Sequence, residues 1–133
     1  MHGAYKCIVG QPQPAFHCKL IVWERSVALC TAVYALTRKF PREKLYGLTN
    51  QVLRASVSIP SNIAEGYGRG SRDQYRYFLG IAQGSYLELQ TQLLIASNLG
   101  FADSAEVTEV ASQASEVGRM LAAILRKLNA PEP

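Results

Sequence analysis

The chain has 133 residues, of which 48% are hydrophobic and 18% are charged, a composition that fits one globular domain and excludes an intrinsically disordered chain. No apolar run approaches the ~20 residues that span a bilayer, and no basic start with an apolar stretch marks a secretory signal. Three cysteines, Cys7, Cys18 and Cys30, have no C-x-x-C spacing and cannot all pair within one chain, which favours a reduced, cytoplasmic protein.

The net charge of +4 conceals an asymmetry between the two parts of the chain. Residues 1–76 hold eleven Lys and Arg against four acidic residues, a balance of +7, whereas residues 77–133 hold three against six, a balance of −3. Such polarity suggests one end or face suited to a polyanion, and a solvated basic surface is the alternative.

A tail and four helices are expected along the chain. Residues 1–18 carry Pro12, Pro14 and Gly10 without periodicity and are predicted to be an irregular N-terminal tail. From there the apolar spacing predicts helices over about 19–39, 44–66, 71–98 and 104–129. Short connections between long amphipathic helices favour antiparallel neighbours, so residues 19–130 are predicted to form an all-α, up-down-up-down four-helix bundle.

The first helix is expected to end at Phe40-Pro41, because a residue before proline is disfavoured in the α region. Its apolar spacing predicts one stripe that faces the core. That stripe is Leu20, Trp23, Val27, Cys30 and Tyr34. The stripe of the second helix is Leu45, Leu48, Val52, Ala55, Ile59 and Ile63. Pro60 lies within it, where it costs ~3 kcal/mol unless the helix bends. The helix therefore kinks at Pro60 or restarts with Ser58 as a cap, and the continuous stripe favours the kink.

The third helix begins near Ser71, a natural N-cap, with Asp73 in its first turn, and Gly100 supplies its stop. Its core stripe is Phe78, Ala82, Ser85, Leu89, Leu93 and Ala96. Asp103 or Ser104 opens the fourth helix, with an a/d repeat of Val107, Val110, Ala114, Val117, Leu121, Ile124 and Leu128.

The first three helices carry a second apolar stripe, predicted to face away from the core. Burial of such a stripe gains ~25 cal/mol per Å² of apolar surface, so self-association is the expected reason for it, and loose patterning is the alternative. The predicted oligomer interface is Val22, Leu29, Val33, Leu36, Leu53, Val57, Leu87 and Leu94.

No metal or cofactor site is predicted. Both histidines, His2 and His17, lie outside the helices, so the helical Glu-x-x-His pairs of a di-iron bundle are not expected. The spacing of these histidines with Cys7 and Cys18 matches no zinc pattern.

No catalytic site is predicted either. Glu65 and Glu88 could form a carboxylate pair for acid–base chemistry if the second and third helices align. The simpler interpretation is that Arg54, Ser58 and Ser61, with Glu65 on the same stripe, form hydrogen bonds and ion pairs between helices.

Two clusters of basic residues are candidates for nucleic-acid binding. One surrounds the Gly66–Ser71 turn, whose amides could also hold a phosphate, and is interleaved with tyrosines as single-stranded nucleic acid prefers. An up-down bundle places the clusters at opposite ends, so only an oligomer could unite them. The clusters are Arg38, Lys39, Arg42 and Lys44 at the first connection, and Arg69, Arg72 and Arg76 at the second.

Several motifs closely resemble the four-helix-bundle proteins encoded in intervening sequences of bacterial 23S ribosomal RNA genes. The similarity covers about residues 19–101, and the last helix only by pattern. The motifs are Leu20-Ile-Val-Trp23, Phe40-Pro41, Tyr46-Gly-Leu-Thr-Asn-Gln51, Arg54-Ala55, Ser58-Ile-Pro-Ser-Asn-Ile-Ala-Glu-Gly66, Gly84-Ser85 and Glu88-Leu89.

The resemblance implies a cytoplasmic bundle that assembles as a homopentameric ring. It also implies kinship with the accessory protein of diversity-generating retroelements, a basic pentamer that binds nucleic acid and a reverse transcriptase. It implies no catalytic residues. The leading hypothesis is therefore a non-enzymatic, homo-oligomeric, RNA-associated protein. The alternative is an oligomeric scaffold or adaptor for a protein partner, such as a reverse transcriptase or a ribosome-associated factor.

Overall fold

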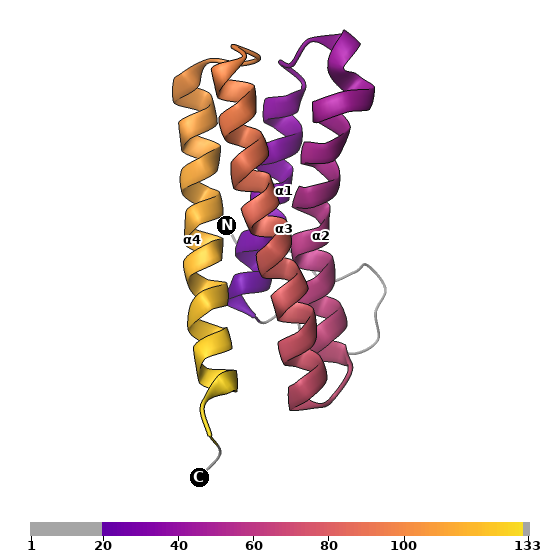
Figure 1. Ribbon diagram of the computed structural model, residues 1–133, viewed down its shortest axis with the longest axis vertical. Coiled ribbons are helices and arrows are strands. Elements are labelled where there is room, and N and C mark those ends of the chain that lie inside the picture. Colours follow the sequence, from indigo (N-terminus) through magenta and orange to yellow (C-terminus); the bar gives the residue numbers. More distant parts are fainter. Residues whose placement is uncertain (1–19, 132–133) are drawn as a thin grey trace.

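The computed structural model describes residues 20–131, without the side chains of residues 44–46. Its long helices are α1 (Ile21–Thr37), α2 (Asn50–Gly68), α3 (Arg72–Asn98) and α4 (Ser104–Asn129), and no strand occurs in this range. The helices run up-down-up-down, with the α1–α2 and α3–α4 connections at one end and the α2–α3 turn at the other, beside the end of α4 (Figure 1). The predicted all-α four-helix arrangement is confirmed. The predicted tail lies outside the described residues.

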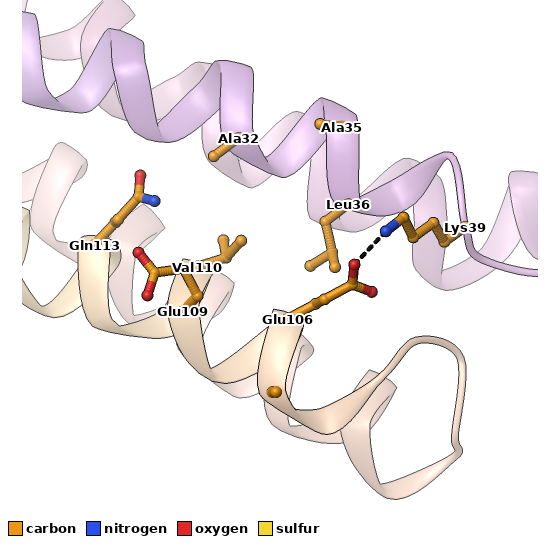
Figure 2. A pocket seen from close by; sticks show the side chains of 9 residues that line it. Ala32, Ala35, Leu36, Lys39, Glu106, Glu109, Val110 and Gln113 are labelled. Carbon is orange, nitrogen blue, oxygen red and sulfur yellow. Dashed lines mark hydrogen bonds and ion pairs between the residues drawn. The ribbon is translucent and has the colours of Figure 1, made fainter.

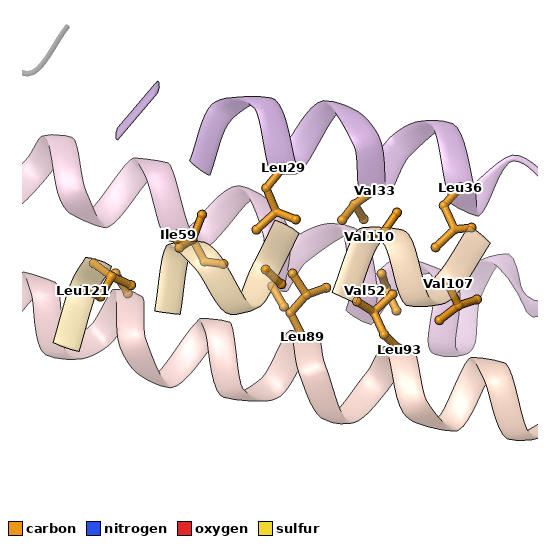
Figure 3. Packing of buried hydrophobic residues seen from close by; sticks show 14 of the residues in the cluster. Leu29, Val33, Leu36, Val52, Ile59, Leu89, Leu93, Val107, Val110 and Leu121 are labelled. Carbon is orange, nitrogen blue, oxygen red and sulfur yellow. The ribbon is translucent and has the colours of Figure 1, made fainter. Parts of the chain in front are cut away.

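The core runs along the middle of the bundle, where side chains from all four helices interdigitate (Figure 3). In α2 the predicted stripe is buried at Val52, Ala55, Ile59 and Ile63, and in α4 it is buried from Val107 to Leu121. In α3 it is Leu79, not Phe78, that is fully buried at the start of the stripe, whereas the rest of that stripe is as predicted.

The orientation predicted for α1 is wrong. Val22, Leu29, Val33 and Leu36, predicted to line the outer face, are at most 5% exposed and lie in the core. Tyr34, predicted to be in the core, is 43% exposed. The reason is that α1 is apolar on two faces, so the three-and-four spacing fits both stripes equally well. These four side chains cannot form an oligomer interface, because they are covered within the protomer.

The second helix begins later than predicted. A 3-10 turn (η3, Arg42–Lys44) and a π-helical turn (η4, Leu45–Thr49) precede α2. Gly47 interrupts the helical backbone there, with φ −108° and ψ −114°. Beyond it α2 is continuous through the buried Pro60, which excludes a helix that restarts at Ser58. A bend at Pro60 stays a prediction.

Both ends of α3 follow the predicted turn chemistry. The hydroxyl of Ser71 accepts a hydrogen bond from the backbone N–H of Gln74 at 3.1 Å, as an N-cap does. Gly70 and Gly100 adopt left-handed φ values of 81° and 71°, which glycine reaches without strain. These two turns fix the lengths of α2, α3 and α4 and hence the alignment of their ends.

Candidate functional site

Arg72 and Arg76, predicted to contact nucleic acid, lie against the C-terminal end of α4. The Nε and Nη2 atoms of Arg72 donate hydrogen bonds to the carbonyl oxygen of Leu128 at 3.2 and 3.0 Å, and Nη2 also reaches the carbonyls of Lys127 and Ala130. Arg76 Nη1 donates to the Leu128 carbonyl at 3.3 Å. The last carbonyls of a helix lack partners within it and carry partial negative charge. Both arginines therefore stabilise the end of α4.

Carboxylates and a ring make further contacts with the arginines of this cluster. Arg69 Nε donates to Glu65 Oε2 at 2.8 Å, and its guanidinium lies 5.1 Å from the centroid of the Phe78 ring. Arg76 Nη2 donates to Asp73 Oδ1 at 2.7 Å. All three arginines of the α2–α3 end thus hold the turn and the helix ends together. Nucleic-acid binding by these three arginines stays a prediction, and the contacts that the structure shows for them are structural.

Two tyrosines pack beside this turn. The rings of Tyr67 and Tyr75 meet edge to face, with centroids 5.6 Å apart. Burial raises the pKa of the Tyr75 phenol above its ordinary value, and the neighbouring Tyr67 raises it further. The neutral phenol of Tyr75 is therefore part of the packing between α2 and α3.

The other predicted cluster, at the α1–α2 end, retains unpaired charge. Arg38 and Arg42 are exposed, and neither forms an ion pair within residues 20–131. Lys39 forms an ion pair with Glu106 of α4. The side chain of Lys44 lies outside the described part of the structure. Two unpaired guanidinium groups therefore line the same hollow at this end of the bundle.

A hollow of about 460 Å³ lies between these two arginines. Thr49 forms part of its wall, is 5% exposed, and has a buried hydroxyl with no hydrogen-bond partner in the described chain. Phe40, which also lines the hollow, makes an edge-to-face contact with Phe101, at 5.6 Å between ring centroids. The described lining residues are Thr37, Arg38, Phe40, Pro41, Arg42 and Thr49.

A second, polar cleft of about 340 Å³ separates α2 from α3. At its floor Ser85 Oγ donates to Ser58 Oγ at 2.8 Å, which confirms one of the predicted interhelical hydrogen bonds. The amide oxygen of Gln92 is buried and has no partner among the described residues. Six of the seven lining residues belong to the motifs that carry the family resemblance. The cleft is lined by Gln51, Arg54, Ala55, Ser58, Ser85, Glu88 and Gln92.

The register of α2 and α3 separates the two candidate catalytic carboxylates. Ser58 lies beside Ser85, and Gly66 lies beside Phe78. Because the helices are antiparallel, each step forward along α2 faces a step backward along α3, so Glu65 faces the region of Phe78. Glu65 and Glu88 are then about ten residues apart along the helices, or ~15 Å. The carboxylate pair considered from the sequence is therefore not formed.

A third hollow, of about 420 Å³, is a groove between α1 and α4 (Figure 2). Ala32 and Ala35 are too small to fill the space between the helices, and Leu36 and Val110 form an apolar floor. The ion pair of Lys39 with Glu106 crosses one end of this groove. Its lining is therefore mostly apolar with a charged rim.

The outer face of α3 exposes large apolar side chains. Leu87 is 56% exposed and Leu94 is 61% exposed, and Val57 of α2 is 40% exposed. Leu53 is half-buried against the core. Of the predicted interface, then, the residues of α2 and α3 reach the surface, unlike those of α1. The further exposed apolar side chains are Tyr77, Ile81 and Ile95 of α3, and Leu99 directly after it.

The described residues include no group of three or more His, Cys, Asp or Glu placed to hold a metal ion. The histidines and two of the cysteines considered from the sequence fall outside the described range. Within residues 20–131, none of the helices combines the length and the apolar character needed to cross a bilayer.

A family model described as 23S rRNA-intervening sequence protein matches residues 18–123. The chain belongs to this family. A crystal structure of a protein of unknown function from the S23 ribosomal protein family of Bacteroides thetaiotaomicron shares the fold, with a TM-score of 0.72 over 80% of this chain and 99% of that one. The two sequences are 19% identical, so this likeness concerns the fold alone. No curated protein matches the sequence. The family membership and the shared fold agree with the bundle, and they carry no established function.

Proposed function

We propose that this protein is a non-enzymatic homo-oligomer that associates with RNA in the cytoplasm through basic residues at the α1–α2 end of the bundle. The observation that supports RNA binding is that two exposed arginines, Arg38 and Arg42, line one hollow and have no carboxylate partner in the described chain. Guanidinium groups that are not already paired can bind phosphates without first losing an ion pair. The charge asymmetry of the sequence supports the same conclusion.

Filter binding of single-stranded RNA across a salt series tests this proposal. Each phosphate contact releases counterions, so the logarithm of affinity should fall with the logarithm of salt by about 0.7 per contact. Arg38→Gln and Arg42→Gln should each reduce that slope by about one contact. Arg119→Gln, which removes an exposed arginine of α4, is the matched control and should leave the slope unchanged. Affinity that is independent of salt, or absent binding at low salt, would contradict the proposal.

Self-association is supported by two surfaces of matching length. Leu87 and Leu94 are seven residues apart on α3, and Ala32 and Lys39 are seven residues apart along the α1–α4 groove, or ~10 Å in each case. We propose that the exposed leucines of one protomer enter the groove of the next. Because the two surfaces differ, the contact is heterologous and can close a ring. The homopentamer implied by the family resemblance would be one such ring.

Light scattering of variants tests this contact. Leu94→Glu should dissociate the oligomer through the α3 face, and Ala35→Glu should do so through the groove. Thr108→Glu, on the exposed outer face of α4, is the control. A mixture of the Leu94→Glu and Ala35→Glu proteins should form dimers, because each retains the surface that the other lacks. A monomeric parent protein, or a mixture that stays monomeric, would refute the heterologous contact.

The second candidate is an adaptor that binds a protein partner. Tyr34 of α1 and Val57 of α2 expose apolar side chains that the proposed ring contact does not use. A pull-down that recovers a stoichiometric protein after nuclease treatment, and loses it with Val57→Lys, would favour this function. Kinship with the retroelement accessory protein stays an expectation of the resemblance.

A further inference from the structure

The hollow at the α1–α2 end contains a buried donor that the fold leaves unsatisfied. Thr49, the residue before α2, is 5% exposed, and its hydroxyl has no hydrogen-bond partner in residues 20–131. By contrast, Thr37 in the same wall donates to the carbonyl of Tyr34 at 3.1 Å. Buried polar groups without partners are uncommon and unfavourable. Because Thr49 lines the hollow, an acceptor bound deep within it is the candidate partner for this hydroxyl.

The charge around the hollow is positive and uncompensated by its lining. Arg38 and Arg42 line it, whereas no carboxylate is among the described lining residues, not even the adjacent Glu43. Elsewhere in the described chain, Arg25, Arg69 and Arg76 each pair with a carboxylate. Arg54, Arg119 and Arg126 form no ion pair within residues 20–131 either, but Arg54 shares its cleft with Glu88, and the other two line none of the hollows described above. Two guanidinium groups and a hydroxyl form a donor set suited to an oxyanion with several oxygens.

The donor set fits a terminal phosphate better than an internal one. A phosphate monoester carries nearly two negative charges and three free oxygens near neutral pH, whereas an internal phosphodiester carries one charge and two free oxygens. A terminal phosphate is joined to the RNA through one oxygen, so it can enter a hollow further than an internal phosphate, which is joined through two. We infer that this hollow binds the terminal phosphate of a single-stranded RNA. The inference rests on the proposed function for the identity of the RNA and adds the chemical group that is recognised.

Fluorescence anisotropy with three otherwise identical short RNAs tests the inference. One carries a 5′-phosphate, one a 3′-phosphate and one only hydroxyl ends. The parent protein should bind one of the phosphorylated RNAs about ten-fold more tightly than the hydroxyl-ended RNA. Arg38→Gln and Arg42→Gln should each reduce this ratio to nearly one. Thr49→Val, which removes the hydroxyl at nearly constant volume, should lower the ratio without unfolding the protein.

The ratio within one variant is the readout, because it cancels any change in stability. Arg38 is the C-cap of α1, where positive charge is favourable, so its removal also affects folding slightly. Arg119→Gln is the control for loss of one charge. Arg119 is 13 residues along α4 from Glu106, which pairs with Lys39 at the α1–α2 end, so it lies ~20 Å from that end. It should leave the ratio unchanged.

The outcomes separate this inference from the proposed function. Equal affinity for the three RNAs, with salt-dependent binding retained, overturns the terminal-phosphate site and leaves RNA association intact. If none of the RNAs binds, but inorganic phosphate or a nucleoside monophosphate raises the melting temperature of the parent and not of Arg38→Gln, the phosphate site stands and RNA association fails. If neither RNA nor phosphate binds, both are refuted.

Discussion

Gly66 lies where α2 and α3 approach most tightly in the turn region, and its replacement by alanine is expected to force the helices apart. A Cβ at this position would lie 2.7 Å from the Cβ of Phe78 and 3.3 Å from the carbonyl oxygen of Tyr75. Neither atom can move by a change of rotamer, because both are fixed to the backbone of α3. Relief of the contact therefore requires a shift of one helix relative to the other.

Two opposing effects set the magnitude. Alanine is favoured over glycine inside a helix by ~1 kcal/mol, which alone would make Gly66→Ala stabilising. Insertion of a methyl group into a closely packed contact costs ~1–3 kcal/mol. The difference of these two terms is a loss of about 0–2 kcal/mol in the free energy of unfolding, and the close 2.7 Å contact favours the upper part of that range. Gly68 is the matched control, because it lies in the same helix, is exposed, and a Cβ there meets nothing within 4 Å. Gly68→Ala should stabilise by about 0.5 kcal/mol.

Urea denaturation followed by circular dichroism measures both changes. The two variants should shift the midpoint in opposite directions with an unchanged slope, since a constant slope indicates that the same surface is exposed on unfolding. The reasoning would be refuted if Gly66→Ala stabilised the protein as much as Gly68→Ala, because the close approach of α2 and α3 would then be absent.

Three further changes test separate contacts. Arg72→Gln should lower the free energy of unfolding by about 1 kcal/mol and increase hydrogen exchange in the last turn of α4, since it removes the donors to those carbonyls; unchanged exchange there would contradict the capping. In a double-mutant cycle of Ser58→Ala and Ser85→Ala, the coupling energy should be about 0.5–1.5 kcal/mol, and a value near zero would count against their hydrogen bond. The raised pKa of Tyr75 shows that folding favours the neutral phenol. The stabilisation of the fold by this neutral phenol is complete below the unfolded pKa of 10.0, and it is lost as the pH rises through the higher folded pKa. The free energy of unfolding of Tyr75→Phe should therefore fall less than that of the parent as the pH becomes alkaline. An equal fall in both proteins would show that ionisation of Tyr75 is not the cause.

The bundle itself is predictable because each long helix carries at least one apolar stripe at helical spacing. In α4 the stripe from Val107 to Leu121 is apolar on one side and polar on the other, so the spacing defines the core without ambiguity. In α1 both faces are apolar, and the choice between Leu29 and Cys30 as the core position depends on how α1 packs against α2 and α4. That is a tertiary contact, which periodicity does not contain. The break at Gly47 was missed because the apolar stripe of α2 continues in phase across it.

The residues of the candidate site are predictable from the sequence, whereas the contacts of their side chains are not. The sequence located both arginine clusters, and the bundle topology correctly placed them at opposite ends of the molecule. The two clusters differ in the backbone groups that lie near their guanidinium groups. The end of α4 reaches the α2–α3 turn, so Arg72 and Arg76 meet free carbonyls there, and this partner could have been inferred from the up-down topology. The unsatisfied hydroxyl of Thr49 lies at the end of the π-helical turn before α2, and no sequence pattern indicates that turn.

This division of the arginines has a consequence for how the chain responds to salt. At the α2–α3 end the guanidinium groups donate short hydrogen bonds to carbonyls and carboxylates, so their contribution belongs to folding. At the α1–α2 end Arg38 and Arg42 are exposed and unpaired within the described chain, and charges of this kind are screened within about 8 Å at physiological ionic strength. A rise in salt should therefore weaken the binding of a phosphate at the α1–α2 end much more than it weakens the bundle. Removal of Arg72 should have the opposite profile, with lowered stability and an unchanged salt slope of RNA binding. One variant from each end, compared in both assays, distinguishes an arginine that holds the fold from one that is available to a ligand.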